Sequence, residues 1–336
     1  MTKQLFFLFI FFAAVFSAAA DDKNAPQKPP LKTIIIDPGH GGLDGGARGA
    51  VTREAVVALK IGLKLRDLMK AEIPDVNVLM TRERDELPGG LGNKNAALRW
   101  RAELANQNNG DLFVSIHLNA SPANQRYGKR AVGTRQETYY VYSGKGKKKK
   151  KTAKTRTVTI YERYKMPATV KGTQTYILAR DWYEQKVRNA AQKKEVIETS
   201  VETDSLGQDL FTTDPIQARI MAQQYAKYFF QKSLTLASYC EEEFSQSGRY
   251  SWGVQQRDWD GIWVLQATQM PSILVETGFV DNAEEEQYLN SEQGTEEMAR
   301  GILNAIKRYK EMMENPVKTS INTAAEPSAS NKTAGQ

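Results

Sequence analysis

The chain contains only two histidines, and each follows a short apolar run. His40 comes after Ile34-Ile35-Ile36 and the turn Asp37-Pro38-Gly39, and His117 comes directly after Leu112–Ile116. Runs of this length predict buried strands, and ligand sites in open α/β sheets form at the carboxyl ends of strands. One histidine in such a place is usually structural. Two of them, with no others in the chain, make a shared metal site an equally good interpretation.

Glu54 is a third candidate ligand. It opens a predicted helix, 54–70, after a glycine-rich stretch at 41–46 whose residues let the chain fold back beside a strand end. The alternative role is structural, because the helix dipole favours a carboxylate in the first turn. Two His and one Glu are a familiar ligand set for a catalytic zinc, which keeps a fourth position open. The H-E-x-x-H pattern of helical zinc proteases is absent, so a different zinc fold is expected.

Glu276 is a candidate catalytic residue. It ends the apolar run Ile273-Leu274-Val275, and a carboxylate at the end of a buried strand is costly unless it has a partner or a function. Beside a zinc-bound water, Glu276 could accept a proton and later return it to a leaving amine.

The predicted elements alternate between strand and helix. Strands at 33–36, 76–80 and 112–116 alternate with helices at 54–70 and 93–108, which indicates an α/β sheet. We expect a single domain at 31–312, with a twisted mixed β-sheet, helices on both faces and the zinc site at strand ends. The C-terminal half of this domain is expected to hold strands at 173–178, 262–266 and 272–275, and helices at 214–244 and 284–310.

Both ends of the chain differ from this domain. Residues 1–20 have the pattern of a signal peptide cleaved after Ala20, because the apolar run Leu5–Phe16 is too short for a membrane anchor. Residues 21–30 are predicted to be a linker, and 313–336 a disordered tail. We therefore expect export across the inner membrane, to the periplasm or, in a cell without an outer membrane, to the outside. No transmembrane segment is expected after cleavage.

Two segments interrupt the alternation of strands and helices. Residues 126–170 are expected to form a β-hairpin insertion with a lysine-rich tip, and 180–214 are a candidate regulatory insertion. The tip has no interleaved aromatic residues and the chain is predicted to be exported, so nucleic acid is not an expected partner. A net charge of +7 suits an anionic partner such as a cell wall. Cys240 is the single cysteine, and a buried, inert thiol is expected.

Four ordered motifs resemble those of the zinc-dependent N-acetylmuramoyl-L-alanine amidases of the amidase_3 type. The resemblance covers about residues 33–125 and 171–310. It departs at the lysine-rich insertion and at Ser251-Trp252-Gly253, where many relatives carry Arg before the Gly. The motifs are Ile36-Asp37-Pro38-Gly39-His40-Gly41-Gly42, Arg53-Glu54, Ser115-Ile116-His117-Leu118-Asn119-Ala120 and Leu274-Val275-Glu276-Thr277-Gly278-Phe279.

This resemblance implies a peptidoglycan hydrolase that cleaves the amide between N-acetylmuramic acid and L-alanine, in wall remodelling or daughter-cell separation. It implies one Zn²⁺ held by His40, Glu54 and His117, with Glu276 as the catalytic carboxylate. Two alternatives stay open: a zinc peptidase acting on another stem-peptide bond, and a non-catalytic wall-binding protein.

Self-inhibition is a further expectation from the resemblance. Some cell-division members carry an extra helix whose carboxylate caps the zinc until a protein activator removes it. Residues 180–202 lie in the corresponding place, and Glu195 is the candidate capping residue. A solvated surface helix is the alternative.

Overall fold

The computed structural model describes residues 31–145, 149–179, 182, 186, 215–257 and 261–315, without the side chains of 215–219, 221 and 222. The predicted signal peptide and linker, Glu195 and nearly all of the predicted tail lie outside these residues. The strands are β1 (Thr33–Pro38), β2 (Asn77–Met80), β3 (Leu112–Asn119), β4 (Tyr127–Ser143), β5 (Lys150–Lys165), β6 (Thr173–Ile177), β7 (Ser251–Gln256) and β8 (Ser272–Phe279). The helices are α1 (Glu54–Glu72), η1 (Pro88–Gly90), α2 (Lys94–Gln107), η2 (Pro122–Gln125), α4 (Pro215–Gln246), α5 (Trp263–Ala267), α6 (Ala283–Asn290) and α7 (Glu292–Glu314).

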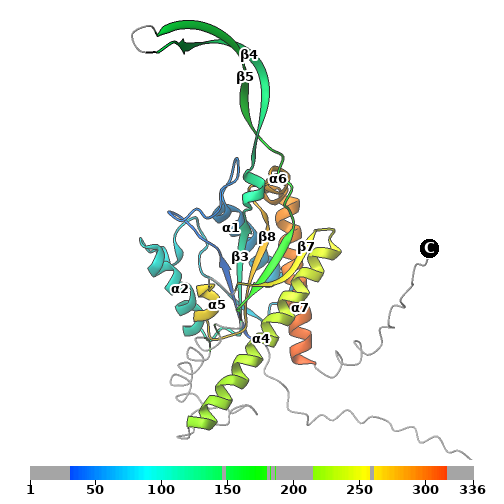
Figure 1. The fold of residues 1–336 in the computed structure, drawn as a ribbon. Helices are drawn as coiled ribbons and strands as arrows, with labels where there is room; N and C mark the ends of the chain where they lie inside the picture. The colour runs from blue at the N-terminus through cyan, green and yellow to red at the C-terminus, as the bar shows by residue number, and fades with distance from the viewer. Residues whose placement is uncertain are drawn as a thin grey trace, which may run out of the picture.

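Six of the strands form one twisted sheet in the order β2-β1-β3-β8-β6-β7 (Figure 1). The first four strands are parallel, β6 is antiparallel to β8, and β7 is parallel to β6. The expected mixed sheet is therefore confirmed. Because β1, β3 and β8 are parallel neighbours, their carboxyl ends share one edge of the sheet.

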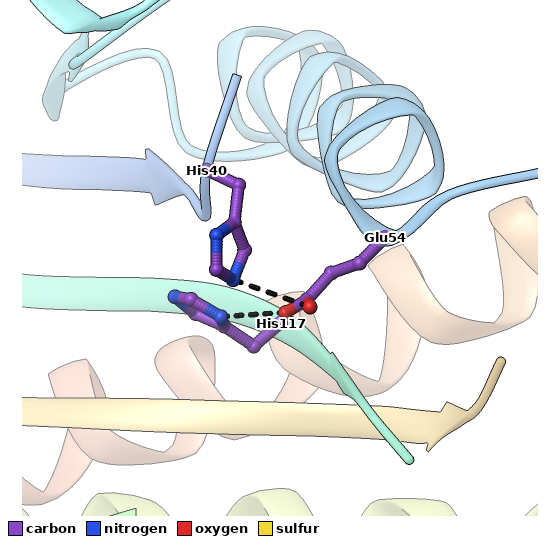
Figure 2. Close-up of side chains that lie close together, drawn as sticks. All are labelled: His40, Glu54 and His117. Carbon is purple, nitrogen blue, oxygen red and sulfur yellow. Dashed lines mark hydrogen bonds and ion pairs between the residues drawn. The ribbon is translucent and has the colours of Figure 1, made fainter. Parts of the chain in front are cut away.

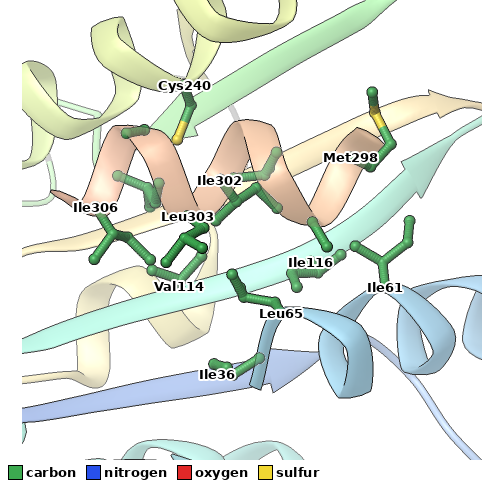
Figure 3. Packing of buried hydrophobic residues seen from close by; sticks show 14 of the residues in the cluster. Ile36, Ile61, Leu65, Val114, Ile116, Cys240, Met298, Ile302, Leu303 and Ile306 are labelled. Carbon is green, nitrogen blue, oxygen red and sulfur yellow. The ribbon is translucent and has the colours of Figure 1, made fainter. Parts of the chain in front are cut away.

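Alternating side chains on the strands supply the cores on the two faces. Ile34 and Ile36 join a large core with α1, α4 and α7, whereas Ile35 joins a smaller core that α2 and α5 cover. This is the period of two that a strand imposes on its side chains. Figure 3 shows α7 packed across β3 and α1, with the side chain of Cys240 entering the core from α4. Cys240 is fully buried, as expected.

Two local predictions in the C-terminal half were wrong, and one strand was not predicted. Residues 262–266 were expected to be a strand but lie mainly in the short helix α5, since a five-residue apolar run fits either structure. The helix expected at 284–310 is two helices, because Ser291 leaves helical geometry and caps α7 by accepting from Gly294 N. The strand β7 was not expected.

The predicted hairpin insertion is present and projects away from the sheet (Figure 1). Its strands β4 and β5 pair from Tyr127↔Lys165 to Ser143↔Lys150, within the expected bounds of 126–170. These two strands form a sheet of their own. Among the described residues, no helix is long and apolar enough to cross a membrane.

Candidate active site

The carboxyl ends of β1, β3 and β8 bring the predicted chemical groups together. Figure 2 shows His40 just beyond β1, His117 on β3 and Glu54 at the start of α1, with the side chains converging. His40 Nε2 lies 3.2 Å from Glu54 Oε2, and His117 Nδ1 lies 2.7 Å from Glu54 Oε1. In the sheet, His117 is the register partner of Glu276 on β8. The fold thus gathers four residues that are up to 236 positions apart in the chain.

His40 has an unusual backbone conformation, with φ at +56°. Left-handed geometry is uncommon for a residue with a side chain, and it turns the chain sharply at the strand end. The glycines next to the site leave the space that the side chains use. A Cβ on Gly39 would lie 2.4 Å from the His117 ring, and one on Gly46 would lie 2.4 Å from Glu54 Oε2.

The Glu54 carboxylate is held by backbone donors as well as by the histidines. Ala47 N donates to Oε2 at 2.7 Å, and Leu118 N donates to Oε1 at 3.1 Å. Burial opposes ionisation of Glu54, but hydrogen bonds and charges from His117 and His40 outweigh burial and lower its pKa. Glu54 is therefore a fixed, ionised carboxylate at a helix start, as the helix dipole also favours.

The orientation of His40 depends on a second carboxylate. His40 Nδ1 lies 3.0 Å from Asp44 Oδ2, and Lys94 Nζ donates to Asp44 Oδ1 at 2.8 Å. Burial would lower the pKa of His40, but hydrogen bonds and charges from Glu54 and Asp44 outweigh burial and raise it. Because Asp44 holds Nδ1, the Nε2 atom faces Glu54. A carboxylate behind a ligating histidine is the arrangement that fixes ring orientation in metal sites.

The three side chains fit a metal ion. His40, Glu54 and His117 each offer one ligand atom, and these atoms lie within 4.8 Å of one another. Two imidazoles and one carboxylate suit Zn²⁺ and leave further coordination positions open. The cluster lies in a cleft of about 550 Å³. It is therefore accessible to a substrate as well as able to bind a metal ion.

Glu276 contributes a second carboxylate, on a half-buried side chain, to the same cleft. Its Oε2 atom is buried and has no hydrogen-bond partner in the part of the chain that the structure describes. Burial raises the pKa of Glu276 well above its usual range, and the negative charge of Glu54 adds to this effect. An orphaned buried carboxyl group is costly, so its position at the cleft indicates a function.

Asp37, Thr81, Arg82, Arg101 and Ser115 hold the His40 turn in place, a role that the sequence did not predict for them. The Asp37 carboxylate is fully buried between Arg101, Thr81 and Ser115, and Arg101 Nη2 also donates to His40 O at 2.6 Å. Arg82 Nη2 donates to Gly39 O and Ala55 O, each at 2.7 Å. Polar residues at otherwise apolar positions of a strand and a helix were the signal that could have found them.

Other residues line the cleft and were not singled out by their spacing. Tyr176 on β6 has a raised pKa, because of burial and then the charge of Glu276. Leu98, Arg257 and Trp263 are also in the lining, and Trp263 is 40% exposed. These side chains give the cleft apolar and cationic walls beside the candidate metal ligands. Glu195, the predicted capping residue, lies outside the described residues and is not placed.

Two curated relatives share parts of this chain. The germination-specific N-acetylmuramoyl-L-alanine amidase of Bacillus subtilis is 35% identical over 133 residues, which are 37% of this chain and 55% of the relative. The N-acetylmuramoyl-L-alanine amidase AmiC of Escherichia coli O6:H1 is 28% identical over 279 residues, which are 82% of this chain and 52% of the relative. The chain thus spans about half the length of these two relatives.

Two further similarities extend over most of the chain. The CwlD amidase of Clostridioides difficile, solved in complex with the GerS lipoprotein, matches 83% of this chain and 98% of that one, with 25% identity and a TM-score of 0.49. The family model for N-acetylmuramoyl-L-alanine amidase matches residues 34–308, a range that contains all four of the converging side chains. The chain therefore belongs to the Amidase_3 family of N-acetylmuramoyl-L-alanine amidases.

Proposed function

We propose that this chain hydrolyses the amide bond between N-acetylmuramic acid and the L-alanine of the stem peptide in peptidoglycan. The observation that carries the proposal is the convergence of three side chains able to bind a metal with Glu276, whose Oε2 atom is buried without a hydrogen-bond partner among the described residues, in one cleft. The choice of this amide bond follows from the family to which the chain belongs, the N-acetylmuramoyl-L-alanine amidases. Hydrolysis of an amide needs an electrophilic carbonyl and a group that moves a proton from water to the leaving amine.

The proposed ion is Zn²⁺, held by His40, Glu54 and His117. When bound, it would supply Lewis acidity to the carbonyl of the scissile amide. The ligand set supports zinc, because imidazole and carboxylate groups suit it, and the backbone N–H groups on Glu54 keep that carboxylate in place. Asp44 and Lys94 orient His40 from behind.

Glu276 moves the proton in this proposal. A carboxyl group whose pKa is raised can hold a proton between two steps, first accepting it from the attacking water and then donating it to the L-alanine nitrogen.

We further propose that the chain is exported and works on the cell wall, which follows from the predicted signal peptide at 1–20 and from the substrate. Control by a protein activator is also proposed. The CwlD amidase forms a complex with a lipoprotein, and residue Glu195 is the candidate that such an activator would displace. In that case, Glu195→Ala raises basal activity without any partner, and an unchanged rate rejects capping by Glu195.

The decisive experiment is digestion of purified peptidoglycan by the full chain, with mass spectrometry of the products. Free stem peptides with an N-terminal L-alanine, and glycan strands without peptides, are the expected products. Cleavage within the stem peptide would instead identify a zinc peptidase. Binding without any cleavage, by metal-loaded protein, would identify a non-catalytic wall-binding protein.

A further inference from the structure

The β4–β5 hairpin carries a large share of the positive charge of the chain. The two strands hold nine Lys or Arg and two Glu, so their net charge of +7 equals the formal net charge of the whole 336-residue chain. At 3.3 Å per residue, the sixteen residues of β5 reach about 50 Å from the body. An isolated two-stranded ribbon is only marginally stable in water, so an arm of this length and charge points to a partner.

The two faces of this ribbon differ in how their charges are compensated. Both acidic residues, Glu137 and Glu162, lie on one face, where they pair across the strands with Arg156 and Arg130. The other face holds no acidic residue. We call it the tyrosine face, and its charged and aromatic members are Tyr127, Lys129, Tyr140, Tyr142, Lys151, Tyr161, Arg163 and Lys165.

Cations lie beside rings at both ends of the tyrosine face. Lys151 Nζ lies 3.9 Å from the centre of the Tyr140 ring, and the Arg163 guanidinium lies 4.6 Å from that of Tyr127. The exposed fraction of Tyr127, Tyr140, Tyr142 and Tyr161 is between 53% and 62%, whereas Tyr139 and Tyr164 on the opposite face are 37% and 40% exposed. Between the rings lies a polar band made of Thr134, Gln136, Thr138, Thr155, Thr157 and Thr159.

This chemistry matches a peptide-bearing glycan. Flat, exposed tyrosine rings can stack on the C–H faces of sugars, and threonine hydroxyl groups can bond to sugar hydroxyl and acetamido groups. The uncompensated cations complement the carboxylates of stem peptides. An anionic membrane fits less well, because Ser143, Gly144, Lys145, Lys149 and Lys150 at the described tip include no large apolar side chain that could enter lipid.

The root of the arm is held to the body by a buried hydrogen-bonded residue near the cleft. It leaves the body through η2, just after β3, which carries His117. The fully buried Asn124 accepts from Thr169 N and Val170 N, and it donates to Val170 O and to Asp281 Oδ1. Ala120, four residues before Asn124, lines the cleft. The arm is therefore anchored to the body close to one wall of the cleft.

We propose that the tyrosine face is a docking surface for peptidoglycan strands, which holds the insoluble wall while the cleft acts on it. This inference rests on the proposed function and adds to it a binding site outside the cleft. It predicts that binding to wall and cleavage of a small substrate are separable.

The test compares two double variants of the full chain that differ only in face. Tyr140→Ala/Tyr161→Ala removes rings from the tyrosine face, and Tyr139→Ala/Tyr164→Ala removes the same side chains from the opposite face. Sedimentation with purified insoluble sacculi is expected to show affinity lower by ~10-fold or more for the first variant and within ~2-fold of the parent for the second. Cleavage of a soluble disaccharide-peptide should be unchanged in both.

Several outcomes would overturn the proposal. These are unchanged sacculus binding in Tyr140→Ala/Tyr161→Ala, equal loss in both double variants, and tighter binding of the parent to phosphatidylglycerol vesicles than to sacculi. A dimer of the parent that only Tyr140→Ala/Tyr161→Ala loses would identify a second copy as the occupant. Failure of the parent to cleave the soluble substrate would instead contradict the proposed function, and sacculus binding would still be measured separately.

Discussion

Charged residues have opposite roles in two regions: the carboxyl ends of the central strands, called here the sheet edge, and the hairpin arm. At the sheet edge, Asp37 and Arg101 form a buried pair with several additional hydrogen bonds each. On the arm, the Arg130–Glu162 pair is exposed, with 65% and 54% of the two side chains accessible to solvent. Buried pairs fix geometry and are costly to break, whereas exposed pairs contribute little to stability. The buried charges at the sheet edge therefore fix the geometry of the candidate active site, whereas the exposed charges on the arm are available to a partner.

Removal of a candidate metal ligand tests the sheet edge most severely. His40→Ala and His117→Ala are each expected to lose stoichiometric zinc and to lose activity to background, since two ligands remain of three. Metal content measured by plasma mass spectrometry checks the result, with circular dichroism as the control for folding. Full zinc content in both variants would rule out the proposed site.

Glu276→Gln tests proton transfer without removing a metal ligand. The amide keeps the shape of the side chain but cannot accept the proton, so turnover is expected to fall by ~10² or more while zinc content stays normal. Product release from soluble substrate measures the effect. Turnover near that of the parent would exclude Glu276 from the mechanism.

Arg101→Leu and Arg130→Leu form a matched pair across the two regions. Arg101→Leu leaves the buried Asp37 carboxylate without its cation, and the expected loss in the free energy of unfolding is ~3–5 kcal/mol. Arg130→Leu removes an exposed partner, and the expected loss is less than ~1 kcal/mol. Chemical denaturation of both variants gives the comparison, which similar losses would contradict.

The pH dependence of stability should also differ between the regions. Burial opposes ionisation of Asp37, but Arg101, Thr81 and Ser115 outweigh burial and lower its pKa. Asp37 therefore contributes stability above its unfolded pKa of 3.8, and this contribution is lost as pH falls through the lower folded value. Asp37→Asn should flatten the fall in stability below pH ~4. Glu137→Gln on the arm is the control, and an equal flattening there would refute the assignment.

The smallest effect is expected at the tip of the arm. Replacing Lys147–Lys151 with serine should leave both the melting temperature and the cleavage of soluble substrate unchanged, since charges at a hairpin tip stabilise the fold little. Binding to sacculi should weaken at low salt and differ less at high salt, where charges are screened. Unfolding of this variant would show that the lysines have a structural role.

The sequence was most informative where one local pattern was enough. Apolar runs identified β1, β3 and β8, and three of the four residues that converge in the cleft, His40, His117 and Glu276, lie at or just after the ends of these runs. The fourth, Glu54, opens α1. The roles of Arg82 and Arg101 could not be found this way, because they depend on which backbone carbonyls the sheet brings near them. The strand–helix error at 262–266 has the same origin, since tertiary packing decides the structure of a short apolar run.

The neck of the arm has a consequence for how this enzyme family can vary. Met166 N donates to Arg126 O at 2.9 Å, so the chain leaves and re-enters the body at almost one point. A turn of a few residues could close the same gap, and loop-closure entropy changes only slowly with length. The arm is thus structurally separable from the body. It can lengthen, change its side chains or disappear without any rearrangement of the hydrolase body, so the choice of surface and the chemistry of cleavage can evolve independently.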